Sequence, residues 1–293
     1  MDCSTRTPTA ILFLLAMLTT ERCSHGDDLP NSSIKSIKPT TGPIVLFDGK
    51  TLGDCYTWLQ DSKLSDPRQV FRVDNGMLHI TGDGFGSLIT NESYRDYHLV
   101  LEYRWGEKTW RDRKNAARDS GLLIHSNGVD GGYSGIWKPS LEVQIIEGGV
   151  GDFILVTGND ESGEPIPMSL TTLVKKDRDG EVVWNEAGEE STFDDVNRSR
   201  INWKDRDPDW DDVKGFRGAK DVDSPGKAWT RIDVFADGDR ITTFVNGTKV
   251  NEALHATPAE GQIQLQTELA EVFFRRWELY PLESGPVPAP AKQ

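Results

Sequence analysis

The sequence predicts an all-β protein, a sandwich of two antiparallel sheets, from three observations. Short apolar or alternating runs recur along the chain, and each is closed by a turn rich in glycine, asparagine or aspartate, which is typical of many short strands. No segment of helix length stands out with apolar residues at helical spacing. No internal repeat is evident, which counts against a propeller. Short strands joined by such turns favour a sandwich.

The expected strands fall into two groups, about 44–156 and 229–280, which together form the two sheets. Asp74-Asn75-Gly76 lies between two short runs and is a hairpin-turn sequence. Asn246-Gly247 marks a further turn. The expected strands are 44–47, 70–73, 77–81, 87–90, 97–105, 121–126, one within 137–149, then 153–156, 230–236, 240–245, 262–267 and 271–280.

The composition excludes some partners. The chain has 293 residues, of which 36% are hydrophobic, enough for a core at this size. It carries 47 acidic residues against 33 lysines and arginines, a net charge of −14. That balance argues against nonspecific binding to nucleic acid, which requires basic residues to neutralise phosphates. It also argues against docking on an anionic membrane.

The N-terminus predicts an exported protein, periplasmic or extracellular. Arg6 precedes a nine-residue apolar run, Ala10–Leu18, which is too short to span a bilayer. Ser24-His25-Gly26 offers a cleavage site, so residues 1–26 are expected to be a signal peptide. Cleavage would leave Cys55 as the single cysteine, which excludes an intrachain disulfide and a cysteine metal cluster.

The rest of the chain is expected to hold one domain between two polar segments. Residues 27–43 are a predicted flexible leader, 44–282 a sandwich domain, and 283–293 a disordered tail rich in proline. Residues 158–225 are polar and acidic, with few long apolar runs. They are predicted to be an insertion with a small hairpin of its own, lying beside the concave face of the sandwich.

A metal ion is left open by the sequence. The stretch Asp205–Asp212 places a carboxylate at nearly every second position, and calcium prefers such oxygens. The stretch lacks the glycine and the terminal glutamate of an EF-hand loop, so a solvated acidic loop is the favoured interpretation. A divalent metal ion such as calcium therefore remains a candidate cofactor without an assigned site.

The stretch from Trp137 to Gly149 carries the best candidate chemistry. Alternation along a strand places Glu142 and Gln144 on one face and the apolar residues between them on the other. A face bearing a carboxylate and an amide is costly to bury unless it binds something polar. Glu147 would fall on the opposite face, unless a bulge or a strand end at Ile145-Ile146 breaks the alternation. We expect such a break, with both carboxyl groups lining one pocket. A solvent-facing strand with surface carboxylates is the simpler alternative.

Several short motifs occur together, and their order and spacing carry a resemblance. They are Leu46-Phe47-Asp48-Gly49-Lys50-Thr51-Leu52, Phe71-x-Val73-x-x-Gly76, Tyr97-x-Leu99-x-x-Glu102-Tyr103-Arg104, Asp119-Ser120-Gly121, Glu142-x-Gln144-Ile145, Val245-Asn246-Gly247, and Gly261-x-Ile263-x-Leu265-Gln266 with Val272-x-Phe274-Arg275. With these motifs, residues 44–282 resemble the bacterial 3-keto-disaccharide hydrolase family. The resemblance implies a concanavalin A-like jelly-roll sandwich.

Three positions depart from the family's pattern. The usual Asn-Ser-Gly appears as Asp119-Ser120-Gly121, and the usual Trp-Asn before a late strand appears as Trp229-Thr230. The aspartate that normally follows Glu-x-Gln-Ile-Leu is replaced by Glu147. The charge type is kept in the third case, whereas the first two change groups that could contact substrate.

The resemblance implies an enzyme that cleaves the glycosidic bond of 3-keto-disaccharides or 3-keto-glycosides. The C2 hydrogen of such a sugar is acidic, because the resulting carbanion is an enolate. A base can remove it, the C1 substituent can leave, and water can add back, or the bond can be hydrolysed directly. The chemistry needs a base, for which Glu142 or Glu147 is expected, and a stabiliser or proton donor, for which Lys138 or His125 is expected. A structural histidine and an exposed lysine are the simpler alternatives for the latter two. The predicted catalytic residues are Glu142, Glu147 and His125, and the predicted substrate-binding residues are Gln144, Lys138, Trp137, Asp119 and Arg104.

Two other functions stay open. Glu142-x-Gln144-x-x-Glu147 is similar to the Glu-x-Asp-x-x-Glu strand of jelly-roll β-glucanases, so a conventional glycoside hydrolase is one alternative. Gln144 replaces the middle aspartate, which makes that alternative weaker. A carbohydrate-binding module without catalysis is the other, since fold alone does not decide function. All three expect a small saccharide as the partner.

Overall fold

The computed structural model describes residues 35–197 and 200–283. These residues belong to one compact unit. The predicted signal peptide, the first part of the leader and nearly all of the predicted tail lie outside them. Within the described ranges, no helix is long and apolar enough to cross a membrane.

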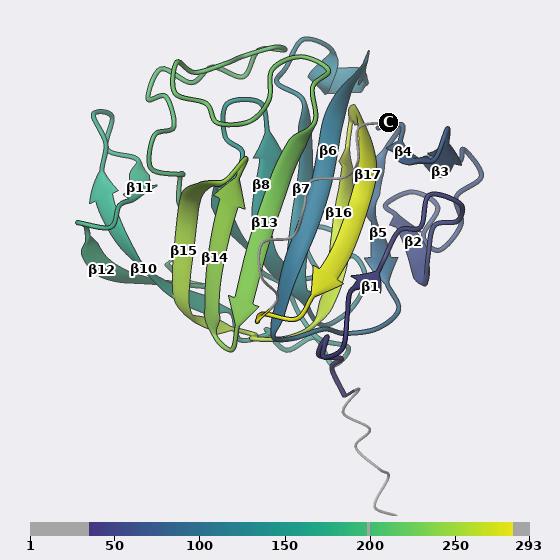
Figure 1. The fold of residues 1–293 in the computed structure, drawn as a ribbon, viewed down its shortest axis with the longest axis horizontal. Helices are drawn as coiled ribbons and strands as arrows, with labels where there is room; N and C mark the ends of the chain where they lie inside the picture. Colours follow the sequence, from purple (N-terminus) through teal and green to yellow (C-terminus); the bar gives the residue numbers. More distant parts are fainter. Residues whose placement is uncertain (1–34, 198–199, 284–293) are drawn as a thin grey trace, which may run out of the picture. The chain divides into compact units, whose positions relative to one another are not determined.

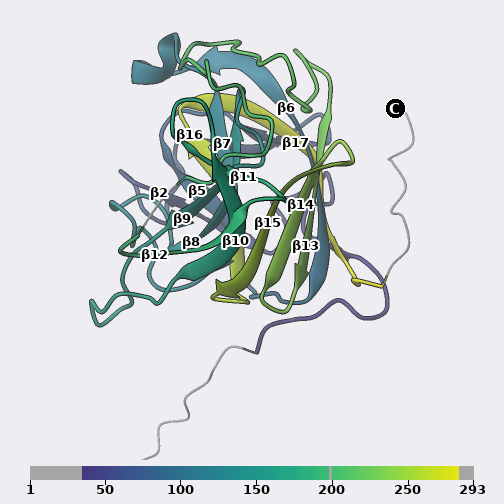
Figure 2. The same ribbon diagram turned by 90° about the vertical axis from the view of Figure 1, so that its left-hand side faces the viewer.

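The protein is an all-β sandwich, as the sequence predicts, with two antiparallel sheets facing each other (Figures 1 and 2). In order, the larger sheet contains β11 (Val182–Trp184), β10 (Ser169–Lys176), β15 (Thr248–Thr257), β14 (Arg240–Val245), β13 (Thr230–Asp237), β6 (Tyr97–Thr109), β17 (Ala270–Tyr280), β4 (Met77–Ile80) and β3 (Phe71–Asp74). Two further strands join it, β1 (Ile44–Val45) beside β17 and β12 (Glu189–Asp194) beside β10.

The smaller sheet lies on the other side of the core and carries the candidate site. Its order is β2 (Cys55–Leu59), β5 (Phe85–Thr90), β16 (Gln262–Glu268), β7 (Asp119–Ser126), β8 (Ser140–Ile146) and β9 (Phe153–Val156). The short 3₁₀ helix η1 (Arg111–Lys114) follows β6.

The core forms because apolar residues alternate along strands of both sheets, which points one set of side chains inward. One continuous buried cluster contains Leu122, Leu141, Val143 and Leu265 from the smaller sheet and Leu99, Leu101, Val234 and Trp277 from the larger. Burying one such side chain contributes about 1.5–3 kcal/mol. Because this cluster occupies the inner face of the strands, functional side chains on the smaller sheet are expected on its outer face.

Two of the turns that the sequence predicts are present as hairpin turns in the structure. Asn75 and Gly76 have φ of 50° and 75° and join β3 to β4. Asn246 and Gly247, at 48° and 82°, join β14 to β15. Two consecutive positive φ values are what a tight two-residue hairpin requires, and asparagine and glycine accept them at low cost.

The segment 158–225 contributes strands to the larger sheet. β10 pairs with β15, and β11 and β12 both pair with β10, so the sheet continues past β15 at the edge shown in Figure 1. The hairpin expected around residues 181–184 forms between β10 and β11, but it extends this sheet instead of standing alone.

Candidate functional site

The outer face of the smaller sheet gathers a set of buried polar side chains. Across the pairing of β7 with β8, Leu123 lies opposite Glu142, Gly121 opposite Gln144, and Asp119 opposite Ile146. Gln264 on β16 also lies opposite Leu123. Leu141 and Val143 on β8 point into the core. Glu142 and Gln144 alternate with them, so these two side chains and their cross-strand neighbours point outward. We call the resulting set the polar face: Asp119, Glu142, Gln144, Gln264, Gln266 and Glu268.

Glu142 occupies the middle of the polar face and is only 4% exposed. Its Oε1 lies over Gly121, so close that a Cβ at that position would overlap it, and Gln266 Oε1 would be only 2.6 Å from the same Cβ. Glu142 Oε1 and both amide atoms of Gln266 have no hydrogen-bond partner within the described ranges. Such buried atoms nearly always have partners, so they mark a place for a water or a ligand.

Three carboxyl groups of the polar face perturb one another. Burial raises the pKa of Glu142 to about 8, and the neighbouring Asp119 adds to the rise. Burial also raises the pKa of Glu268 to about 7, with Glu142 as the next cause. The pKa of Asp119 is raised, first by burial and then by Glu268. Titratable groups shifted by burial and by like charges are typical of functional sites.

Two arginines oppose these carboxyl groups. Arg113, from η1, places Nη2 2.7 Å from Asp119 Oδ2 and 3.1 Å from Glu268 Oε1. Arg200 lowers the pKa of both Glu142 and Asp119. Its Nε donates to Oδ2 of the fully buried Asp152 at 2.8 Å. The site therefore combines acids that hold protons near neutral pH with fixed positive charge.

Lys138 is buried beside the polar face. Its Nζ donates to the Tyr56 hydroxyl at 3.1 Å and to Gln262 Oε1 at 2.6 Å, and it is 3.1 Å from Asp130 Oδ1. Its carbonyl accepts a hydrogen bond from Gln264 Nε2. The lysine is therefore buried, at 8% exposure, and linked to the polar face through Gln264.

Trp137 covers part of the same face. It packs with Leu123 and Val156 in a second apolar cluster, and its Nε1 donates to the Gly86 carbonyl at 3.1 Å. Its ring stacks on Tyr133 with centroids 6.0 Å apart. One indole face and the N–H are thus engaged by the protein, and Trp137 is only 9% exposed, so it shapes the site more than it offers a platform for a sugar.

Glu147 does not join Glu142. Strands β7 and β8 pair without a register shift through Ile146, and β8 ends at that residue, so the break expected at Ile145-Ile146 is a strand end and not a bulge. The Glu147 carboxylate instead accepts from Arg118 N at 2.9 Å, Arg118 Nη1 at 2.8 Å and Gly215 N at 2.8 Å. The predicted convergence of the two glutamates is wrong, because Arg118 and Gly215 hold the Glu147 carboxylate just beyond the end of β8.

His125 also lies outside the polar face, contrary to expectation. The register between β7 and β16 shifts at this point, and His125 has a φ of 52°. That bulge turns the ring inward, where it meets Tyr97 edge-on at 5.9 Å. Nδ1 is 3.1 Å from the Pro258 carbonyl. Burial lowers the pKa of His125 to about 4, so the imidazole is neutral and sits between the sheets.

Arg104 belongs to the larger sheet. Its guanidinium lies over the Trp229 ring at 4.8 Å and the Phe273 ring at 5.6 Å. Phe273 is its cross-strand partner on β17. Arg104 therefore does not share the smaller sheet with Glu142, and the substrate contact expected of it is not supported by its place in the fold.

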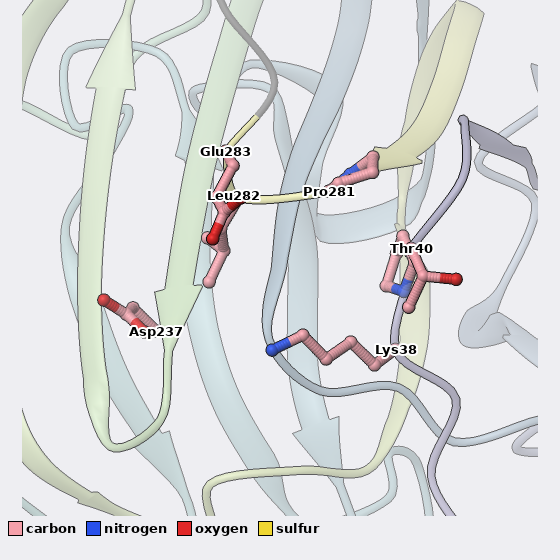
Figure 3. A pocket seen from close by; sticks show the side chains of 7 residues that line it. Lys38, Thr40, Asp237, Pro281, Leu282 and Glu283 are labelled. Atoms are coloured by element: carbon pink, nitrogen blue, oxygen red, sulfur yellow. The ribbon is translucent and has the colours of Figure 1, made fainter.

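No group of three histidine, cysteine, aspartate or glutamate side chains in the described ranges is arranged to hold a metal ion. The divalent metal ion considered from the sequence therefore has no site among these residues and stays a prediction. A separate hollow of about 370 Å³ is lined by both end segments of the described chain, with Lys38 and Thr40 near Pro281 and Glu283 (Figure 3). It contains no residue of the polar face.

The sequence analysis missed five contributors to the site. For Gln264, Gln266 and Glu268 the sequence held a signal, because polar and apolar residues alternate through most of 262–268. For Arg113 and Arg200 it held none, since they reach the carboxyl groups from a short 3₁₀ helix and from an irregular segment distant in sequence.

Comparison with known proteins gives the family. A model of the 3-keto-alpha-glucoside-1,2-lyase-like domain matches residues 42–279. No curated protein matches the chain significantly. A provisionally assigned glycosyl hydrolase from Parabacteroides distasonis is similar at 15% identity, over 83% of this chain and 94% of that one, with a TM-score of 0.45. A carbohydrate-binding module from Bacillus subtilis is similar at 14% identity, over 69% and 85%, with a TM-score of 0.38.

The family assignment rests on the length of the first match. Residues 42–279 include every described strand except the last residue of β17, so the match covers the whole sandwich and the polar face with it. The resemblance drawn from the sequence is thereby confirmed. The chain belongs to the family of 3-keto-alpha-glucoside-1,2-lyase-like domains.

Proposed function

We propose that this protein cleaves the glycosidic bond of 3-keto-glycosides, including 3-keto-disaccharides, by removing the C2 proton and eliminating the C1 substituent. The observation that carries the proposal is the state of Glu142, a carboxyl group buried among other acids on the outer face of the smaller sheet, with a pKa of about 8. The family's description supplies the substrate class. An ordinary surface carboxylate would be too weak a base for this proton.

Glu142 is the proposed base. A general base works best when its pKa lies near the working pH, because it then combines basicity with a useful ionised fraction. With a pKa of about 8, about a tenth of the protein carries ionised Glu142 at pH 7. Its Oε1, buried above Gly121, is the proposed proton acceptor.

Arg200 is the proposed partner of the developing negative charge. Removal of the C2 proton places charge on the C3 oxygen as an enolate, and fixed positive charge in a dry site stabilises such an oxyanion. Arg200 already acts on Glu142 electrostatically. Asp152 holds its Nε, so the guanidinium needs little reorganisation during the reaction. Arg113, paired with Asp119 and Glu268, adds further positive charge.

The remaining steps of the reaction need only a proton donor from the polar face and a water molecule. The enolate returns its electrons to form the C1–C2 double bond while the C1–O bond breaks. The departing oxygen takes a proton from a protonated carboxyl group, for which the raised pKa of Glu268, about 7, is suitable. Water then adds across the double bond and yields the free 3-keto sugar.

The surroundings of the polar face favour catalysis over simple binding. Sugar-binding faces commonly present exposed aromatic rings, yet the large apolar side chains that are exposed in the described ranges are all aliphatic: Ile37, Val45, Leu64, Val196 and Val213. The separation of Glu147 from Glu142 also removes the carboxylate pair on which the similarity to the β-glucanase strand rested. A binding module and a glycosidase are therefore the less favoured functions.

The proposal is tested by product analysis in D₂O with a 3-keto-glucoside, the corresponding plain glucoside and trehalose. Elimination predicts release of the alcohol from the 3-keto compound alone, with deuterium entering C2 of the sugar. Cleavage without deuterium at C2 would indicate direct hydrolysis, and cleavage of plain glucosides would indicate a glycosidase. Saturable binding without turnover would support the binding module.

The same proposal includes the protein's location. The N-terminal pattern favours export, so the substrate would be met outside the cytoplasm. N-terminal sequencing of the exported protein would find a start near Asp27, whereas a retained Met1 or a lipid-modified Cys23 would contradict it.

A further inference from the structure

A second pocket lies where the ends of the two sheets meet the segment 215–226. Trp105 comes from β6 of the larger sheet, and Glu147 directly follows β8 of the smaller one. The cavity measures about 190 Å³. We call it the end pocket, and its lining residues are Trp105, Arg118, Glu147, Gly215, Phe216, Arg217, Asp223, Ser224, Pro225 and Gly226.

The charges in the end pocket cancel in pairs. Arg118 Nη1 lies 2.8 Å from Glu147 Oε1, and Arg217 Nη1 lies 3.1 Å from Asp223 Oδ1. Because each carboxylate has its own guanidinium, neither an anion nor a cation would find an uncompensated opposite charge. The pocket is therefore polar but electrically balanced, which favours a neutral ligand.

Polar atoms without partners remain around this cavity. Within the described ranges, Trp105 Nε1 and Arg118 Nε are buried and lack a hydrogen-bond partner, and Trp105 is only 5% exposed. Asp223 uses Oδ1 for Arg217, while no hydrogen bond reaches its Oδ2 within the same ranges. Two buried donors thus stand unused among the residues of one cavity, where buried polar atoms normally have partners, and Asp223 adds an acceptor to its lining.

Glu147 builds the pocket without offering much to a ligand. Its oxygens already accept three hydrogen bonds from Arg118 and Gly215. Trp105 and Phe216 supply apolar surface beside the polar groups. The volume lies below the roughly 300 Å³ at which pockets for drug-sized ligands begin, so one ring fits better than two linked rings.

From this combination we propose that the end pocket binds a single neutral sugar ring, either a monosaccharide or the terminal unit of a longer glycan. Hydroxyl groups both donate and accept, so they can satisfy Asp223 Oδ2 together with Trp105 Nε1 and Arg118 Nε. The C–H face of the ring packs on the aromatic walls. Since Glu142 is not among the lining residues, this site is separate from the proposed catalytic one.

Ligand-observed NMR tests the end pocket directly. The full chain is titrated with methyl α-D-glucoside and D-galactose as neutral probes, and with gluconate and glucosamine as charged ones. The variants are Asp223→Asn, which alters the acceptor, and Trp105→Phe, which keeps an aromatic ring but removes Nε1. Glu142→Gln reports on the polar face, and circular dichroism checks that each variant is folded.

The expected result is saturable binding of at least one neutral probe by the parent and by Glu142→Gln. Asp223→Asn and Trp105→Phe should each weaken it about tenfold, the scale of one lost hydrogen bond to a buried group. The proposal is overturned if no neutral sugar binds, if a charged probe binds better than the neutral ones, or if both pocket variants bind like the parent. It is equally overturned if Glu142→Gln alone abolishes binding, because the sugar then sits on the polar face.

Discussion

Glu142 fills the space that a side chain at Gly121 would need. Its Oε1 lies within overlap distance of a Cβ built on that glycine, and Gln266 Oε1 follows at 2.6 Å. Gly121 and Gln144 are direct partners across β7 and β8, so the carboxylate of Glu142 reaches along the sheet to the next pair of residues. The lack of a side chain at Gly121 thus determines the position of the Glu142 carboxylate, the proposed base.

Gly121→Ala should displace the Glu142 carboxylate while keeping the fold. The atoms that a new methyl group would meet belong to the ends of flexible side chains, which can move at modest cost. Misplacing a catalytic group by about 1 Å can cost on the order of 100-fold in rate. We therefore expect turnover of a 3-keto-glucoside to fall by roughly that factor, measured together with thermal unfolding.

Gly106→Ala is the matched control for that variant. A Cβ there would likewise meet a glutamate side chain, Glu271, but Glu271 belongs to the larger sheet. Turnover of Gly106→Ala should stay near that of the parent. Equal losses in both variants, or no loss in Gly121→Ala, would show that the position of Glu142 does not matter for the reaction.

Asp152→Asn tests how Arg200 is held. Asp152 is fully buried and accepts from Arg200 Nε at 2.8 Å and from Trp203 N at 2.6 Å. The amide loses the charge that fixes the guanidinium, so Arg200 should act less on Glu142. Because Arg200 lowers the pKa of Glu142, the pKa should rise in the variant.

The pH dependence of kcat separates this positioning role from a structural one. A higher pKa of the base moves the rising limb of the profile to more alkaline pH. Asp152→Asn should show that shift in addition to any loss of stability. A uniform drop in kcat with an unmoved profile would mean that Asp152 only supports the fold.

Glu142→Gln should gain stability relative to the parent as the pH rises. Folded Glu142 keeps its proton up to a pKa of about 8, against an ordinary value of 4.5. Between these values the folded state binds more protons than the unfolded chain, so the parent loses stability with increasing pH. An amide cannot ionise and avoids that loss.

Urea unfolding across this pH range measures the difference. The free energy of unfolding of the variant, relative to that of the parent, should be larger near pH 9 than near pH 5 by about 4 kcal/mol. Using the difference between two proteins cancels most of the titration that they share. A gap that does not change with pH would mean that the carboxyl group of Glu142 is not perturbed by the fold.

The fold and part of the candidate site could be predicted from local sequence. Alternation is a local property, so it correctly places Glu142 and Gln144 together and away from the core. The turn at Asn75-Gly76 was equally readable, because few residues accept its backbone angles. What depended on one strand and its neighbours could be predicted.

Bulges and loops account for the rest. Strict alternation would keep His125 on the face of Glu142, yet the register shift between β7 and β16 turns it inward. A bulge or a strand end was expected near Ile146, and β8 ends there without a bulge. Where a strand gains an extra residue depends on its partner strand, which a single sequence does not specify. Arg113 and Arg200 reach the site through tertiary packing alone.

The most direct test of the proposed function is the turnover of a 3-keto-glucoside by Glu142→Gln, compared with Glu102→Gln. Both glutamates are buried, at 4% and 2% exposure, but Glu102 pairs with Arg275 on the larger sheet. If Glu142 is the base, its variant should fold and lose roughly two to four orders of magnitude in kcat, while folded Glu102→Gln keeps the parent rate. Parent-like turnover by Glu142→Gln would contradict the account.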